Sequence, residues 1–207
     1  SGSDSLFGDA GDDYLNGGTD QDEMRGGAGN DTFVVDDAGD LVVEVLGEGL
    51  DTVLSSVSYT LTNNVERLTL TGTAVIGVGN DLNNAIHGTD LANILQGLEG
   101  RDRLFSGAGS DGLSGGLGND YLDGGLDGEA DYFYFEVGDG DDVIANYECG
   151  IDRIVIEDGT GGALAFGDLT VSAHGSGTLI EYGTSGDSIY IVDVGLLPFG
   201  ASDFIFT

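Results

Sequence analysis

An aspartate returns every nine residues in two parts of this chain, each time within a glycine-rich turn. These aspartates are Asp4, Asp13, Asp22 and Asp31 in the first part, and Asp102, Asp111 and Asp120 in the second. Glycines allow positive φ angles, so about six residues can form one tight turn. The three residues that follow can form only a short strand, whose single apolar side chain points inward. The period therefore predicts a regular stack of turns and short strands.

Two such units make one coil of a flattened solenoid, with turns at alternating edges, so aspartates two units apart are expected to stack about 4.8 Å apart. The stacked pairs are Asp13 with Asp31, Asp4 with Asp22, and Asp102 with Asp120. Carboxylates at this spacing repel each other unless a cation lies between them. Turn carbonyls can supply the further oxygens that Ca²⁺ requires. The predicted inward-facing residues are Leu15, Met24, Phe33, Leu104, Leu113 and Leu122.

Two segments carry the complete motif G-G-x-G-x-D-x-U-x, where U is a large apolar residue: residues 26–34 and 115–123. This motif is the calcium-binding nonapeptide, and the chain resembles the RTX, or hemolysin-type calcium-binding, family. The resemblance implies an all-β fold, a calcium-stabilised parallel β-roll or β-helix in two repeat blocks with a C-terminal β-hairpin cap. It also implies a C-terminal region of a type I-secreted bacterial exoprotein, and the start at Ser1 inside a repeat fits such a piece.

The resemblance further implies a ligand set for each calcium ion, in which one turn gives two carbonyls and its aspartate, and the turn one coil later gives the same. The first implied site joins Asp9, Gly11 and Asp13 to Gly26, Ala28 and Asp31. The second joins Leu98, Gly100 and Asp102 to Gly115, Leu117 and Asp120. The third joins Gly107, Gly109 and Asp111 to Gly124, Leu126 and Asp131, whose turn is two residues longer than the motif. Further implied metal ligands are Asp4, Gly17, Thr19, Asp22, Gly118 and Asp142.

Two early turns of the second run carry Asn84 and Asn93 where the motif has aspartate. An amide oxygen can ligate calcium but carries no charge, so weaker metal sites are expected there. A single glycine-rich turn would be typical of any protein surface. Ten turns in phase indicate calcium sites instead.

The chain has 38 acidic residues, five arginines and no lysine, which gives a formal net charge of −33. This charge argues against binding to nucleic acid or anionic membranes through a basic patch. Several Ca²⁺ ions would supply counter-charge, so calcium binding is expected to contribute to the folding free energy. Extracellular calcium modules typically need about 10⁻⁴–10⁻³ M calcium, which predicts folding outside the cell, as a secreted or cell-surface protein.

The sequence shows no signal peptide and no apolar run near the length of a membrane span. The single cysteine, Cys149, excludes an intrachain disulfide and is expected to be buried as a small apolar residue.

Four segments are expected along the chain. Residues 1–34 form a first β-roll. Residues 35–78 form strand-rich coils with worn repeats, including a strand-like run from Thr52 to Leu61, or an inserted β domain as the alternative. Residues 79–159 form a second roll. Residues 160–207 form a cap of β-hairpins, with strands expected at 169–173, 178–182 and 188–194. The ending, residues 203–207, also resembles the acidic and then hydrophobic end of type I-secreted RTX proteins.

The leading functional hypothesis is a calcium-binding module that folds after secretion and stabilises an upstream domain of the same polypeptide. Its expected partners are calcium ions, that domain and, during export, the type I secretion machinery. The alternatives are a polysaccharide-binding accessory module of a carbohydrate-modifying enzyme, although −33 suits a polyanion such as alginate poorly, and a self-associating adhesin or surface-layer segment.

No enzyme is expected within these residues. Ser114 matches a G-x-S-x-G motif formally, but it straddles two calcium repeats with no helix following.

Overall fold

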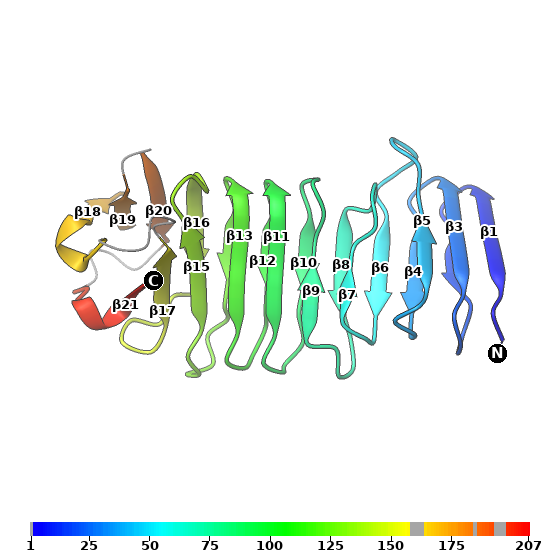
Figure 1. Ribbon diagram of the computed structural model, residues 1–207, viewed down its shortest axis with the longest axis horizontal. Coiled ribbons are helices and arrows are strands. Elements are labelled where there is room, and N and C mark those ends of the chain that lie inside the picture. Colours follow the sequence, from blue (N-terminus) through cyan, green and yellow to red (C-terminus); the bar gives the residue numbers. More distant parts are fainter. Residues whose placement is uncertain (1, 158–163, 184–185, 193–197) are drawn as a thin grey trace.

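The computed structural model describes residues 2–157, 164–183, 186–192 and 198–207. The chain forms a parallel β-solenoid in which the strands follow one another along the long axis, from β1 near the N-terminus to β18–β21 at the other end (Figure 1). The predicted fold class, an all-β calcium-repeat solenoid, is confirmed. No helix in the described part of the chain is long and apolar enough to cross a membrane.

One wall of the solenoid is an eleven-stranded sheet. In order it contains β2 (Tyr14–Asn16), β4 (Thr32–Val35), β6 (Thr52–Ser55), β8 (Arg67–Leu70), β10 (Ala85–His87), β12 (Arg103–Phe105), β14 (Tyr121–Asp123), β16 (Asp141–Ala145), β20 (Asp187–Ile191), β19 (Gly177–Tyr182) and β18 (Thr170–His174).

Two sheets form the opposite wall. The shorter has β1 (Ser5–Ala10), β3 (Glu23–Ala28) and β5 (Leu41–Val43). The longer has β7 (Tyr59–Thr60), β9 (Ile76–Val78), β11 (Ile94–Gly100), β13 (Gly112–Gly118), β15 (Tyr132–Glu136), β17 (Arg153–Glu157) and β21 (Phe204–Phe206). Two short 3₁₀ turns, η1 (Phe166–Asp168) and η2 (Ala201–Asp203), lie near the C-terminal end.

The inward column of apolar side chains follows from the strand register. Ile86 pairs with Leu104, and Leu104 pairs with Leu122, so one residue from every coil stacks on the next. The six inward residues expected from the repeat are all buried, between 0% and 4% exposed. Each coil thus contributes about one large apolar side chain per strand, a thin core that depends on stacking for its continuity.

Residues 35–78 contain coils of unequal length. The N–H of Asp31 reaches Asp51, 20 residues on, and the N–H of Asp51 reaches Glu66, 15 residues on. The strand run expected from 52 to 61 is divided instead into β6 and β7, which lie in different sheets. The chain turns between them because Ser55 hydrogen-bonds Val57 O at 2.7 Å and ends β6. β6 and β8 nevertheless lie within the eleven-stranded sheet. The four-segment division of the chain remains a proposal.

The C-terminal segment both folds back on itself and extends the solenoid. β18, β19 and β20 pair antiparallel, close to the three expected strands, of which residues 193–194 lie outside the described residues. A cap of hairpins alone is an incomplete description, because β20 also pairs parallel with β16, and β21 pairs parallel with β17. Phe204 of β21 is buried and packs its ring near Phe166 and Phe199. The C-terminal segment therefore covers the last coil of the core.

Deleting residues 160–207 should prevent the second run of repeats from folding. Ile154 and Ile156 lose their partners on β21, so apolar side chains and strand edges are exposed to water. Calcium binds at turns and cannot cover this open end. Far-ultraviolet circular dichroism during a calcium titration should show a disordered or aggregated chain where the intact chain folds. An unchanged calcium midpoint would contradict a capping role.

Candidate calcium sites

The aspartates of the turns lie in two columns, one along each edge of the solenoid. Within a column, the backbone N–H at one aspartate position donates to Oδ1 of the aspartate one coil later. On the first edge these bonds join Asp13 to Asp31 (2.8 Å), Asp31 to Asp51 (2.8 Å), Asn84 to Asp102 (2.7 Å), Asp102 to Asp120 (2.7 Å) and Asp120 to Asp142 (2.9 Å). On the second they join Asp4 to Asp22 (2.8 Å), Asp22 to Asp40 (3.0 Å), Asn93 to Asp111 (2.7 Å), Asp111 to Asp131 (2.9 Å) and Asp131 to Asp152 (3.1 Å). The expected stacked pairs are all present.

The second carboxylate oxygen of most of these aspartates is buried and has no hydrogen-bond partner. These Oδ2 atoms belong to Asp13, Asp22, Asp31, Asp102, Asp111, Asp120, Asp131 and Asp142. In the described part of the chain the one ion pair, Arg25 with Glu23, involves none of them. A buried carboxylate oxygen without a partner is unfavourable by about 1–3 kcal/mol for the lost hydrogen bond, and by more when the group is charged. A column of such oxygens is the donor set that a hard cation requires.

Backbone oxygens converge on the same places. A Cβ built on Gly97 would lie 2.5 Å from Gly115 O, one coil later, and against Oδ2 of Asp102. A Cβ built on Gly8 would meet Gly26 O at 2.5 Å and Oδ2 of Asp13 at 2.8 Å. The space that each glycine leaves open is therefore lined by carboxylate and carbonyl oxygens from two coils. This is the all-oxygen environment that suits Ca²⁺.

The other carbonyls implied as ligands also face the following coil. Leu98 O lies against the position that a Cβ on Gly116 would occupy, and Gly107 O stands in the same relation to Gly125. Gly11 O and Gly100 O likewise face Gly29 and Gly118. Asp9 and Leu98 adopt φ angles of 70° and 84°, the left-handed turn that the repeat usually assigns to glycine.

Several implied ligands have other roles in the structure. Ala28 O accepts a hydrogen bond from Gly11 N at 2.7 Å, and Gly124 O accepts one from Ser106 Oγ at 3.2 Å. Leu117 and Leu126 are 52% and 69% exposed, and a leucine can offer a cation only its backbone carbonyl.

Some of the remaining implied ligands lie beside an aspartate oxygen, and others have a different contact. Gly17 leaves open space beside Oδ2 of Asp22, whereas Thr19 is exposed at the surface. Gly118 donates its N–H to Asp139 O at 2.7 Å.

The asparagine turns are satisfied by protein groups alone. Asn84 Nδ2 donates to Val65 O at 3.2 Å, and Asn84 Oδ1 accepts the Asn80 N–H at 2.7 Å. Asn93 similarly donates to Ala74 O at 3.3 Å and accepts the Thr89 N–H at 2.6 Å. Neither amide leaves a buried atom without a partner, in contrast to the aspartates. An amide N–H₂ here makes the contacts to the preceding coil, so these turns can form without a cation.

The structure adds acidic residues that the repeat pattern did not assign. Asp40 and Asp152 end the two continuous stretches of the second edge, and both of their carboxylate oxygens accept backbone N–H groups. Asp51 continues the first edge, and Glu44 lies beside it with Asp31 in a group whose ligand oxygens are all within 4.8 Å of one another. The eighteen-residue offset from Gly26 to Glu44 is the signal that could have found this residue.

Burial raises the pKa of several of these carboxyl groups. The pKa of Asp142 rises to about 8, chiefly through burial, with the charge of Asp120 adding to it. Burial likewise raises the pKa of Asp102 and Asp131 to about 7, and of Asp120 to about 6. Without a cation these groups would hold protons near neutral pH, and a bound cation would displace them.

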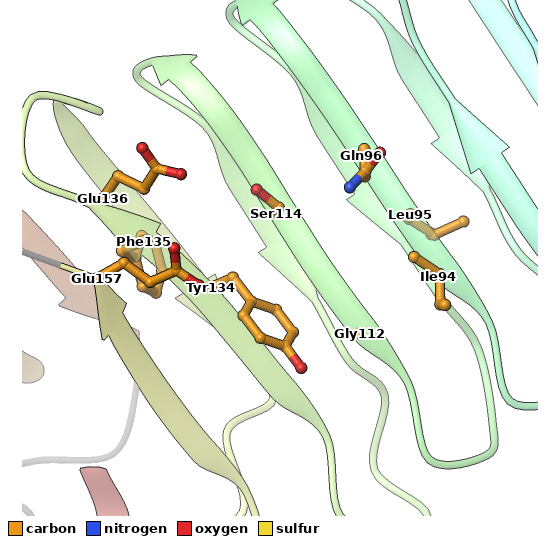
Figure 2. A pocket seen from close by; sticks show the side chains of 9 residues that line it. All are labelled: Ile94, Leu95, Gln96, Gly112, Ser114, Tyr134, Phe135, Glu136 and Glu157. Atoms are coloured by element: carbon orange, nitrogen blue, oxygen red, sulfur yellow. The ribbon is translucent and has the colours of Figure 1, made fainter. Parts of the chain in front are cut away.

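Ser114 lies inside strand β13, lining a shallow hollow on the longer sheet of the second wall. Figure 2 shows Gln96 on one flank, Tyr134 and Glu136 on the other, and Gly112 with Ser114 between them. A nucleophile elbow needs a strand–turn–helix junction, whereas this serine is a mid-strand residue and no histidine lines the hollow.

The exposed cysteine is a further difference from expectation. Cys149 lies on the surface rather than in the core, in the turn between β16 and β17.

Comparison with known proteins agrees with this geometry. Residues 1–33, 78–113 and 87–122 match the RTX calcium-binding nonapeptide repeat in four copies. The chain carries RTX calcium-binding repeats. Such repeats bind calcium, and the buried acidic groups on both edges fit multiple Ca²⁺ ions. Residues 34–77, with their unequal coils, lie outside the matched segments.

One curated relative and two of the similar solved structures show what this chain resembles. The endo-1,3-1,4-beta-glycanase ExsH of Rhizobium meliloti (strain 1021) is 35% identical over 85 residues, 41% of this chain and 18% of ExsH. The AlgE6R2 subunit of the Azotobacter vinelandii mannuronan C5-epimerase is 24% identical, with a TM-score of 0.50 over 64% of this chain and 91% of the subunit. The extracellular lipase LipA of Serratia marcescens is 16% identical, with a TM-score of 0.51 over 100% of this chain and 40% of the lipase. The two structural likenesses show a shared fold, and the chain spans less than a fifth of ExsH.

Asp120→Ala should raise the calcium midpoint of folding markedly, and Asp4→Ala should barely change it. Asp120 is 2% exposed and hydrogen-bonds to coils on both sides, so its loss removes a ligand and a link in the column. Asp4 is exposed at the start of the first coil and serves as the matched control. A calcium titration followed by circular dichroism measures both midpoints. Equal midpoints would rule out the stacked arrangement.

Calcium that binds to already folded coils should release protons near neutral pH. Because the pKa of Asp142 and Asp102 is higher in the folded chain than in the unfolded chain, the metal-free fold binds more protons and loses stability as pH rises from about 4 to about 8. Calcium requires the charged form, so its affinity for a folded coil should fall as pH drops from about 8 to about 6. Calorimetry in two buffers of different ionisation enthalpy, at about pH 7 and at calcium concentrations where circular dichroism already shows β structure, gives the number of protons released. A value of zero in that range would contradict this linkage.

Proposed function

We propose that this RTX chain is a calcium-triggered folding module of an extracellular protein. It would fold when it meets external calcium after secretion and would then stabilise an upstream domain of the same polypeptide. The observation that carries the proposal is the pair of columns of buried carboxylate oxygens without a protein partner. With a net charge of −33, the compact chain is strongly self-repelling until cations enter.

Export through a type I secretion system is part of the same proposal. The ending that resembles such a signal forms the short strand β21, which pairs with β17 in the folded chain. A polypeptide that stays unfolded at low calcium leaves this segment accessible until export is complete. We place catalytic activity outside these residues, in the remainder of a longer protein. RTX repeats occur in secreted proteins, which supports an extracellular location.

Calcium should drive folding cooperatively. In excess chelator the far-ultraviolet circular dichroism spectrum should be that of a disordered chain, and it should gain β signal as Ca²⁺ is added. Magnesium is the control, since its shorter and stricter octahedral coordination should make it a poor substitute. A fully folded spectrum in the absence of any divalent ion would refute calcium-triggered folding.

Polysaccharide binding is a second candidate, favoured by one surface. On the outer face of β10, β12 and β14, the ring of His87 stacks on Phe105 at 4.8 Å between centroids. The Arg103 guanidinium lies 5.6 Å from the Phe105 ring and 5.5 Å from the Tyr121 ring. Arg101 lines a second shallow hollow together with Arg103 and Tyr121. We call His87, Arg101, Arg103, Phe105 and Tyr121 the aromatic strip; it holds two of the five arginines of an otherwise acidic chain, and Arg103 lies against two of its rings. The similar protein ExsH is a glycanase, which agrees with a polysaccharide partner.

The strip should retard the chain in a gel containing alginate or a mixed-linkage β-glucan, at saturating calcium. Arg103→Ala and Tyr121→Ala should abolish retardation, because they remove the cation and one ring of the strip. Tyr134→Ala, in the hollow of Figure 2 on the opposite wall, is the matched control and should bind normally. This second function would be contradicted if the unaltered chain were not retarded. It would also be contradicted if only the control variant lost retardation. Calcium-dependent light scattering would instead support a self-associating adhesin.

A further inference from the structure

A glutamate replaces glycine at the first position of one turn. Its side chain points into the oxygen-lined space between two coils, called here the slot, that glycines such as Gly8 and Gly97 leave open. Glu44 lies one coil after Gly26, and its carboxylate accepts the Gly26 N–H at 3.1 Å. The residue is 7% exposed, and its Oε2 atom is buried without a hydrogen-bond partner. A Cβ built on Gly26 would meet both this carboxylate and Oδ2 of Asp31. The side chain therefore enters the space that glycines leave open in regular coils.

The backbone carbonyl of Glu44 has a protein partner of its own. In regular coils the corresponding carbonyl lines the slot, as Gly26 O does beside Gly8 and Gly115 O does beside Gly97. The carbonyl of Glu44 instead accepts a hydrogen bond from Asn64 Nδ2 at 3.0 Å. A charged side-chain oxygen thus takes the place of a neutral backbone oxygen.

Two further carboxylates complete the group. Asp31 and Asp51 are each 1% exposed, and their oxygens lie with Glu44 within 4.8 Å of one another. Oδ2 of Asp31 is also buried without a partner, while Asp51 accepts the Asp31 N–H at 2.8 Å. Three buried carboxylates in one place, two with free oxygens, require a cation more strongly than the two-carboxylate turns do.

We propose that Asp31, Glu44 and Asp51 form a three-carboxylate calcium site that binds more tightly than the regular repeat sites. The proposal rests on the calcium-binding function of the module and adds an order of filling. Calcium affinity rises with the number of charged ligands in a site, and this site carries one more than its neighbours. It lies where the first repeats meet the unequal coils of residues 35–78. Filling it first would join these two parts of the solenoid before the remaining sites load.

The test counts calcium ions retained by the full chain in equilibrium dialysis at low free Ca²⁺, set so that the unaltered chain holds about one ion. Glu44→Gln keeps the shape and the acceptor for Gly26 N but removes the charge. It should retain no ion, with affinity for the first ion at least about tenfold weaker. Glu99→Gln makes the same chemical change at an exposed position of β11 and should retain one ion, like the unaltered chain.

Equal retention by Glu44→Gln and Glu99→Gln would overturn the three-carboxylate site. If calcium still folds both variants, the calcium-triggered function survives that result; if calcium folds neither the variants nor the unaltered chain, the function itself fails. Should Glu44→Gln not fold at saturating calcium, Glu44→Asp provides the comparison, because it restores the charge on a shorter side chain. Folding of Glu44→Asp with Ca²⁺ supports the site, and failure of both variants assigns Glu44 a role in shape alone.

Discussion

Repulsion between buried carboxylates stacked one coil apart governs this molecule. Two unit charges about 5 Å apart repel by roughly 3 kcal/mol at an effective dielectric constant of about 20, and each column repeats that contact along the solenoid. The aspartates stay in place because Oδ1 is held by a backbone N–H of the preceding coil, as in Asp102 and Asp120. The hydrogen bond that fixes the geometry thereby leaves Oδ2 aimed into the slot. Cation binding relieves the strain that folding creates.

The thin core explains why the cation matters so much. Leu104 and Leu122 stack in register, but each coil adds few such side chains, and conformational entropy opposes the ordering of every turn. In the turns of Asn84 and Asn93, a side-chain amide replaces the cation as the link between coils, because its Nδ2 donates a hydrogen bond to a carbonyl of the preceding coil. The solenoid therefore mixes coils that depend on a cation with coils that do not. The coils that do not depend on a cation begin the second run of repeats, where they join directly to the coils of Asp102 and Asp111.

Much of this arrangement could be predicted from the period alone. The inward leucines and the stacked aspartates follow from nine-residue spacing, because two units must return the chain to the same edge. The glycine pattern did not assign Glu44, which lacks the glycine that marks a turn, and only its eighteen-residue offset from Gly26 points to it. Asp51 ends a worn repeat that is two residues too long, as Asp131 does, and the pattern did not assign it as a ligand. The run from Thr52 to Leu61 was expected to be one strand. The spacing of its apolar residues does not show where the chain crosses from one sheet of the solenoid to the other. Cys149 was expected to be buried, yet its turn leaves it exposed, because residue type predicts burial poorly outside a repeat.

The direction of the column hydrogen bonds gives the solenoid a polarity. In every link of both columns the N-terminal coil donates and the C-terminal coil accepts, from Asp4 to Asp22 and from Asp131 to Asp152. Before the next coil forms, water can hydrogen-bond to the amide N–H. If the next coil folds without its acceptor, that N–H is buried without a partner. The loss of one acceptor aspartate thus destabilises the coil on its N-terminal side, and it removes no hydrogen-bond acceptor from the coil on its C-terminal side. The first coil therefore depends, through this chain of acceptors, on the folding of the later coils. A domain packed against the first coil would depend on them as well.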